Sequence, residues 1–208
     1  RLYPNAKLAI GPAIENGFYY DVEFTTPIVF SDLDKIETEM KRIIKADFPI
    51  ERYTLTRKEA VKLMKNFSEP YKVQLIEELP DDAVISFYKQ GDFVDLCRGP
   101  HLPSTGKIKA FKLTAITGAY WKGDSKNKML TRIYGTAFEK KTELEEYLKR
   151  LEEIKQKDHN KLGRDLEYFQ TVDVIGQGLP ILLPKGAKVV QILQRFVEDE
   201  EYKRGYQL

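Results

Sequence analysis

The chain has 208 residues, of which 32% are charged and 42% hydrophobic, a composition typical of one or two globular domains with a sizeable core. A formal net charge of +2 excludes a polybasic protein, and no apolar run approaches the roughly 20 residues that span a bilayer, so no membrane partner is expected. One cysteine and no recognisable signal peptide are typical of a cytoplasmic protein.

Short strands and amphipathic helices alternate in the first half of the chain. Strands are predicted where aromatic and β-branched residues concentrate, at Lys7–Ile10, Gly17–Phe24, Ile50–Leu55, Val84–Lys89, Asp92–Leu96, Ala110–Ile116 and Lys128–Tyr134. Helices are predicted where apolar residues recur at helical spacing, from Ser31, from Thr56 to about Asn66, and from Pro70 to Leu79. This order predicts an α+β domain with a largely antiparallel sheet.

Local signals fix the ends of several of these elements. Ser31 with Asp34, and Thr56 with Glu59, have the spacing of a capping box at a helix N-terminus. The strands on either side of Gln90 and Gly91 are expected to form a hairpin.

The second half is different in composition. The chain is charged from Thr142 to about Leu166 and is predicted to be one helix, with His159 on its surface. A segment rich in Gly and Pro follows at Gly176–Pro184, and a last helix is predicted at about Ala187–Lys203. The apolar side of this last helix holds Val189, Val190, Leu193, Phe196 and Val197. A strand is expected to start at Tyr206–Leu208. Because Arg1 is not a methionine and nothing follows to cover that apolar side, we expect a fragment.

Cys97 and His101 are the candidates for chemistry because a thiol and an imidazole lie four residues apart in the sequence. The carboxylate of Asp95 lies two residues before Cys97. Gly99 and Pro100 exclude a regular helix between the thiol and the imidazole, so a short turn aims both side chains at one point. The alternative is that Cys97 is a small buried hydrophobic residue. Two ligand-type residues do not complete a zinc site, so no metal is expected, although Cys97 and His101 are the only candidates.

Basic and aromatic residues interleave between residues 107 and 128, where Tyr120, Trp121 and Lys122 are adjacent. Such a stretch is typical either of contact with a nucleic acid or of a solvated strand edge.

Four segments of the sequence resemble the threonyl-tRNA synthetase family, in the order expected for that family. They are Ile10–Asp21, Tyr71–Val73, Asp95–Pro103 and Gly118–Thr136. The resemblance covers essentially the whole chain. It implies an editing (second additional) domain at 1–136, a linker helix at 137–165, and the start of a class II catalytic domain at 166–208.

The same resemblance implies what this chain is expected to lack. The family's editing site also uses a His-x-x-x-His helix that precedes the position of Arg1, and no histidine precedes His101 here. The ATP-binding motifs and the catalytic zinc ligands are expected beyond Leu208, so ATP, Mg and Zn are expected for the missing catalytic domain and no cofactor for this chain. The parent is expected to form a homodimer through that domain.

By resemblance, the editing residues are Cys97, His101, Lys72 and Asp95, and Tyr19, Tyr20, Tyr120, Trp121 and Lys122 are candidates for binding substrate or tRNA. The last five residues are alternatively core or sheet residues. His101 is expected to position or deprotonate water, and Cys97 to bind or orient water or substrate. Lys72 is expected to stabilise the oxyanion or the terminal phosphate, and Asp95 to hold the seryl amine or the imidazole tautomer.

The implied activity is that of a threonine–tRNA ligase, which attaches threonine to tRNA(Thr) with ATP and hydrolyses mischarged Ser-tRNA(Thr) in its editing domain. Two alternatives stay open: a catalytically incomplete fragment that binds tRNA, and a free-standing trans-editing hydrolase.

Overall fold

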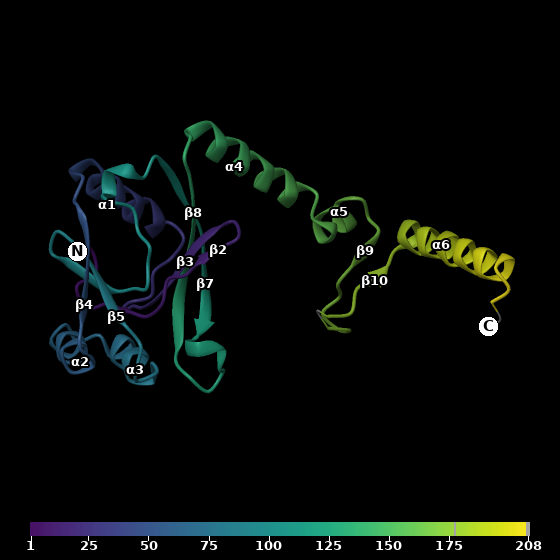
Figure 1. The fold of residues 1–208 in the computed structure, drawn as a ribbon. Coiled ribbons are helices and arrows are strands. Elements are labelled where there is room, and N and C mark those ends of the chain that lie inside the picture. The colour runs from purple at the N-terminus through teal and green to yellow at the C-terminus, as the bar shows by residue number, and fades with distance from the viewer. Residues whose placement is uncertain (177, 207–208) are drawn as a thin grey trace. The chain divides into compact units, whose positions relative to one another are not determined.

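A computed structural model describes residues 1–176 and 178–206, with the elements in the order shown in Figure 1. The chain divides into two compact units, Arg1–Glu145 and Glu146–Leu208. Each unit is described by itself. Of the strand expected at Tyr206–Leu208, Gln207 and Leu208 lie outside the described residues, as does Gln177 of the segment rich in Gly and Pro.

The first unit contains a five-stranded antiparallel sheet of order β1-β3-β8-β7, with β2 paired to the other end of β3. Its strands are β1 (Lys7–Leu8), β2 (Ala13–Ile14), β3 (Gly17–Glu23), β7 (Ala110–Tyr120) and β8 (Met129–Phe138). Strand β7 is longer than predicted because its ladder continues through Gly118 and Ala119, where the apolar pattern is lost. Strand β8 is longer than predicted because it continues beyond Tyr134 and pairs with the first residues of β7, as far as Phe138 opposite Ala110.

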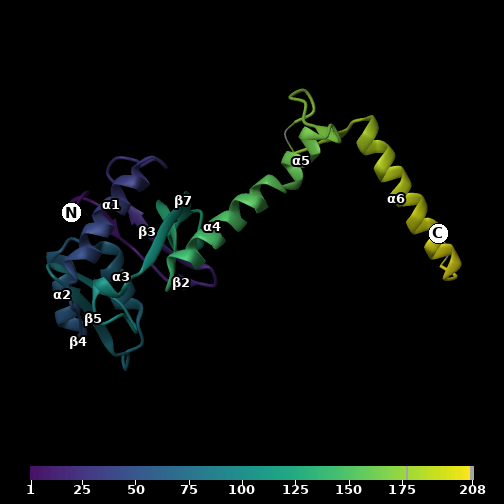
Figure 2. The same cartoon turned by 90° about the horizontal axis from the view of Figure 1, so that it is seen from above.

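Helix α1 (Asp32–Ala46) covers one face of this sheet. Leu33 of α1 packs in one cluster with Leu113 of β7 and Ile133 of β8, and Figure 2 shows α1 beside these strands. Glu37 of α1 is buried and accepts a hydrogen bond from the Leu113 N–H at 2.9 Å. The helix is therefore held to the sheet by a polar contact as well as by apolar packing.

A second sheet in the same unit has three antiparallel strands in the order β4-β5-β6. These are β4 (Ile50–Leu55), β5 (Ile85–Gln90) and β6 (Phe93–Leu96), with the predicted hairpin pairing Gln90 to Phe93. Helices α2 (Arg57–Asn66) and α3 (Pro70–Glu78) pack on one face of this sheet around Met64, Ile76 and Phe87. Because side chains alternate along a strand, the residues on either side of Phe87 point to the opposite face.

The predicted capping box at Thr56 is confirmed and the one at Ser31 is wrong. The Thr56 N–H donates to Glu59 Oε2 at 3.0 Å, and the Thr56 hydroxyl caps the Glu59 N–H. Ser31 already has helical backbone angles and makes no side-chain cap, because the chain enters α1 through a turn. Asp32 Oδ2 accepts a hydrogen bond from the Val29 N–H at 2.8 Å instead.

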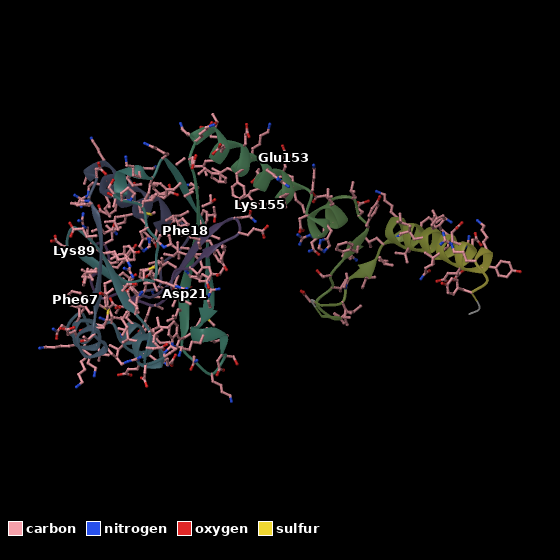
Figure 3. The ribbon with its side chains drawn as sticks, viewed as in Figure 1. Phe18, Asp21, Phe67, Lys89, Glu153 and Lys155 are labelled. Carbon is pink, nitrogen blue, oxygen red and sulfur yellow. The ribbon has the colours of Figure 1, made fainter. Side chains whose placement is uncertain are left out.

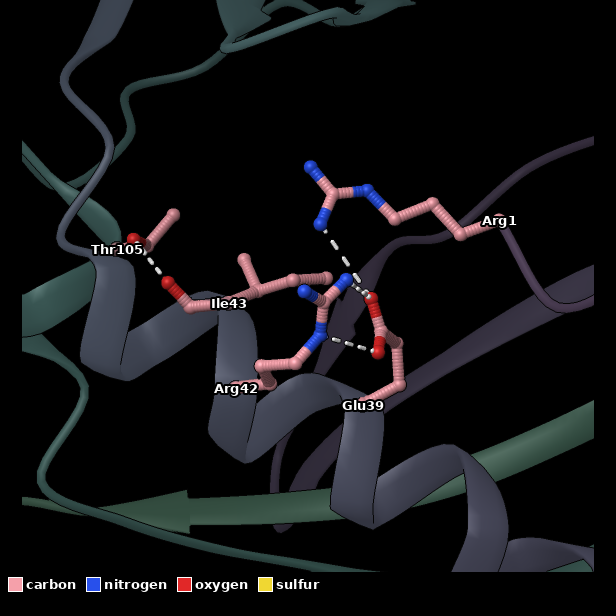
Figure 4. A network of polar contacts seen from close by, with 5 residues as sticks. All are labelled: Arg1, Glu39, Arg42, Ile43 and Thr105. Carbon is pink, nitrogen blue, oxygen red and sulfur yellow. Dashed lines mark hydrogen bonds and ion pairs between the residues drawn. The ribbon is translucent and has the colours of Figure 1, made fainter.

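The C-terminal end of α1 is joined to the loop that follows β6. Thr105, at the start of the short helix η1 (Thr105–Lys107), is buried, and its hydroxyl donates to the Ile43 carbonyl at 3.0 Å (Figure 4). The same oxygen accepts from the Phe48 N–H at 2.9 Å. The adjacent face of α1 holds Arg42 paired with Glu39, which lowers the pKa of that carboxyl to about 2.

The predicted helix from Thr142 to Leu166 is two helices, α4 (Lys141–Gln156) and α5 (His159–Asp165). The break occurs because Asp158 takes the N-cap position of α5, where its carboxylate accepts from the N–H groups of Asn160 and Lys161. His159 is exposed, as predicted.

In the second unit β9 (Phe169–Gln170) and β10 (Ile181–Leu182) form an antiparallel pair, and α6 (Pro184–Lys203) follows. Helix α6 begins three residues before its predicted start, because proline is well accepted in the first helical turn. Its apolar side is exposed at Leu193 (57%) and Phe196 (62%). Within the described ranges, no helix is both long and apolar enough to cross a membrane.

Candidate active site

A cavity of about 1080 Å³ in the first unit is lined by several separate segments of the chain. Its wall includes the loop after β1, Tyr20 of β3, Lys72 of α3, and the exposed face of the β4-β5-β6 sheet. Cys97, Arg98 and His101, from the loop after β6, complete it.

The pairing of the three-stranded sheet places the polar residues of this wall in rows. Arg52 lies directly opposite Tyr88, which lies directly opposite Asp95. In the next row Gln90 lies opposite Phe93, and both line the cavity. The intervening residues, such as Phe87, belong to the core on the other face.

Tyr20, Lys72 and Asp95 form a closed polar cluster at the wall. Lys72 Nζ pairs with Asp95 Oδ1 at 2.6 Å and donates to Tyr20 Oη at 3.0 Å, while Tyr20 Oη donates to Asp95 Oδ2 at 2.5 Å. The Lys72 side chain is 4% exposed. Burial, and then the Asp95 carboxylate, raise the pKa of Tyr20 above its usual range, so its hydroxyl stays protonated and remains a donor. The buried ammonium is thus matched by one carboxylate.

Glu69 precedes Lys72 by three residues, and its carboxyl group interacts electrostatically with Lys72 and Asp95 of this cluster. Its Oε2 accepts a hydrogen bond from the Leu8 N–H at 2.7 Å. Burial raises the pKa of the Glu69 carboxyl, with a smaller contribution from the Asp95 charge.

The loop that carries Cys97 and His101 is fixed to the sheet at its start. The Cys97 N–H donates to the Ser86 carbonyl at 3.1 Å, and the Ser86 hydroxyl donates to the Cys97 carbonyl at 2.6 Å. Gly99 has φ +76°, and a Cβ there would lie 1.9 Å from Tyr88 Oη. The loop therefore needs glycine at this position.

His101 is positioned by an aromatic contact. Its ring meets the Tyr88 ring edge to face, with centroids 4.1 Å apart. No hydrogen bond joins His101 to Asp95 among the described residues, since the Asp95 carboxylate is engaged by Tyr20, Lys72 and the Leu96 N–H. Downstream, the Ile50 N–H donates to the Pro103 carbonyl at 2.9 Å, and Thr105 holds the loop to α1.

The structure brings five of the nine predicted site residues together around the cavity: Tyr20, Lys72, Asp95, Cys97 and His101. The other four, Tyr19, Tyr120, Trp121 and Lys122, are not part of its lining.

These four residues have other surroundings. The Arg132 guanidinium lies over the Tyr19 ring at 3.8 Å. Trp121 is 5% exposed, belongs to a core cluster and packs against Tyr71. Lys122 pairs with Glu78, and Tyr120 is exposed at the end of β7.

Sequence reasoning missed Arg52, Tyr88 and Arg98, which also line the cavity. The alternating pattern of β4 and β5 separates their two faces, but it does not say that the polar face borders a cavity. Among the described residues, no group of three or more His, Cys, Asp or Glu side chains could hold a metal ion.

Comparisons with known proteins agree with the sequence resemblance. Residues 85–134 match the family model of the threonyl and alanyl tRNA synthetase second additional domain. The whole chain is 62% identical over 208 residues to a threonine–tRNA ligase of Clostridium botulinum (strain Alaska E43 / Type E3) and 58% identical over 207 residues to that of Acetivibrio thermocellus. It is 54% identical to that of Anoxybacillus flavithermus. The chain spans 32% of the length of each of these relatives.

Proposed function

From the homology of this chain to threonine–tRNA ligases, which are class II aminoacyl-tRNA synthetases, and from the second additional domain that it contains, we propose that its first unit hydrolyses Ser-tRNA(Thr). The chain is then the editing portion of a longer enzyme that attaches threonine to tRNA(Thr) with ATP. ATP, Mg and Zn, and the homodimer contact, belong in this proposal to the class II catalytic domain of that enzyme.

A need for editing follows from the chemistry of the two amino acids. Serine is threonine without one methyl group, and a site that accepts threonine discriminates against serine by only about 1–3 kcal/mol, or 10–200-fold. A second site that admits the seryl ester and excludes the larger threonyl ester supplies the remaining accuracy.

One observation carries the proposal: Lys72, Asp95, Cys97 and His101 line a single cavity although they come from α3, from β6 and from the following loop. These are the residues that the family resemblance selects from the sequence.

The proposed step is attack of water on the ester carbonyl carbon. His101, exposed at the cavity and held by Tyr88, takes a proton from the water and returns it to the ribose oxygen as the ester bond breaks. Lys72 stabilises the developing oxyanion, and Cys97 orients the water. Asp95 binds the seryl ammonium group through Oδ2, which accepts only from Tyr20, whereas Oδ1 is already engaged by Lys72 and the Leu96 N–H.

The test is deacylation of Ser-tRNA(Thr) by the 208-residue chain, with Thr-tRNA(Thr) as the control substrate. Although no histidine precedes His101 in this chain, we expect hydrolysis of the seryl ester alone, because His101 by itself can transfer the proton, and a loss of about 10²–10⁴-fold in His101→Ala. His159→Ala is the matched control, because it removes the other histidine from an exposed position in α5. Seryl-ester hydrolysis at background rate, or an unchanged rate in His101→Ala, would contradict the proposal. Binding without hydrolysis would instead favour a fragment that only binds tRNA.

A further inference from the structure

Two guanidinium groups at the cavity have no partner within the described part of the chain. The charged side chains of the lining are Arg52, Lys72, Asp95 and Arg98. Lys72 and Asp95 pair with each other. Arg52 and Arg98 make no ion pair, side-chain hydrogen bond or cation–π contact with any described residue, and both are exposed. The cavity therefore presents uncompensated positive charge.

Both arginines lie close to the candidate catalytic residues in the fold. Arg52 is in the same cross-strand row as Tyr88 and Asp95, and Tyr88 carries the His101 ring. Arg98 follows Cys97 directly. Arg52 is therefore directly opposite the residue that contacts His101, and Arg98 is on the same loop as His101.

The chemistry of an unpaired guanidinium favours a particular ligand. Arginine presents a rigid fork of N–H donors that matches phosphate oxygens in a bidentate contact. A seryl ester carries a positively charged amine and no anionic group that could pair with a guanidinium. The nearest anions of an esterified RNA are the phosphodiesters that precede the terminal nucleoside. A cavity of about 1080 Å³ is above the roughly 300–1,000 Å³ usual for one small ligand, which leaves room for part of a nucleotide chain.

We propose that Arg52 and Arg98 bind the phosphodiester backbone of the RNA 3′ end, so that the site takes an ester on a nucleic acid and discriminates against a free aminoacyl nucleoside. In this arrangement the buried Lys72 serves the ester, and the two arginines serve the phosphates. The inference rests on the proposed function for the identity of the ester, but the phosphate contact is tested without any hydrolysis.

The experiment measures binding of two stable probes to the 208-residue chain. One is the trinucleotide CCA with serine joined to its 3′ end by an amide bond; the other is adenosine with the same serine amide and no phosphate. Because hydrogen bonds to charged groups contribute roughly 1.5–3 kcal/mol, we expect Arg52→Ala to weaken trinucleotide binding by about 10-fold or more. The slope of log affinity against log salt concentration should fall by about 0.7 for each phosphate that the variant no longer neutralises. Arg98→Ala should act in the same direction, and adenosine-probe binding should not change.

The matched control is Lys89→Ala. Lys89, labelled in Figure 3, is an exposed cation on β5 next to Tyr88 in sequence, and it is not part of the cavity lining. The Lys89→Ala substitution should leave the affinity for both probes unchanged. Arg52→Lys keeps the charge without the fork and should give intermediate affinity, which tests the inference even if Arg52→Ala folds poorly.

The inference would be overturned if Arg52→Ala bound the trinucleotide with the same affinity and the same salt dependence as the unaltered chain. It would also be overturned if the variant lost affinity equally for both probes. A failure of seryl-ester hydrolysis alone would overturn the proposed function and leave the phosphate contact standing.

Discussion

Two glutamates of the first unit titrate in opposite directions. Glu69 precedes α3, and burial raises the pKa of its carboxyl above the ordinary value of 4.5. Glu23 ends β3, and hydrogen bonds from Lys128 and Tyr71 lower the pKa of its carboxyl below the same value. The protonated form of Glu69 and the ionised form of Glu23 are therefore the forms that favour the folded state.

These directions predict opposite pH dependences for two isosteric variants. The contribution of Glu69 is present below its unfolded pKa and is lost as pH rises through its folded value, so Glu69→Gln should gain stability relative to the unaltered chain at neutral pH. The contribution of Glu23 is present above its unfolded pKa and is lost as pH falls, so Glu23→Gln should lose stability at neutral pH and converge with the unaltered chain in acid. Urea unfolding at several pH values measures both. Parallel curves for the two variants would refute the assignment.

Some residues of the candidate site are predicted from the sequence, and others cannot be. Cys97 and His101 are identified by their spacing around Gly99, and Lys72 and Asp95 by family resemblance. No local sequence pattern identifies Arg52 or Tyr88 as a cavity residue, because their place depends on the pairing of β4 with β5. This pairing sets Arg52 opposite Tyr88, 36 residues further along the chain.

At the scale of elements, the strands and helices of the first unit agree with the sequence pattern, and their ends depend on local hydrogen bonds. The charged region after Thr142 has one helical periodicity, but the favourable cap at Asp158 divides it in two. Neither the turn into α1 nor the continuation of β7 through Gly118 leaves a pattern in the sequence, since both are set by backbone pairing.

The two capping signals give a paired prediction. Thr56→Ala removes an oxygen that caps the Glu59 N–H, and we expect a loss of about 1 kcal/mol in the free energy of unfolding. Ser31→Ala removes a hydroxyl that makes no cap, and we expect no comparable loss. Urea unfolding midpoints at constant slope measure the difference. Equal losses in the two variants would contradict the cap geometry.

At the scale of the whole molecule, apolar surface is unevenly distributed between the units. The first unit buries three clusters of apolar residues, whereas α6 exposes large apolar side chains on one side, among them Ile192, Leu193, Phe196 and Val197. Exposed apolar surface of this kind binds hydrophobic dyes and promotes association.

We therefore expect α6 to account for most of the binding of the dye ANS by the folded chain. Phe196→Ser should reduce ANS fluorescence, because it removes a side chain that is 62% exposed. It should leave the unfolding transition of the first unit in place. The control is Phe87→Leu in the core of the first unit, which should move that transition without reducing ANS binding. Dye binding that is unaffected by Phe196→Ser would mean that the exposed apolar surface lies elsewhere.

Strand β5 serves the core with one set of side chains and the cavity with the other. Phe87 packs against the helices, and the residues beside it, Ser86 and Tyr88, face the cavity. Inserting or deleting one residue in this strand would therefore move each of these side chains to the opposite face, and would damage both the stability of the first unit and the cavity wall.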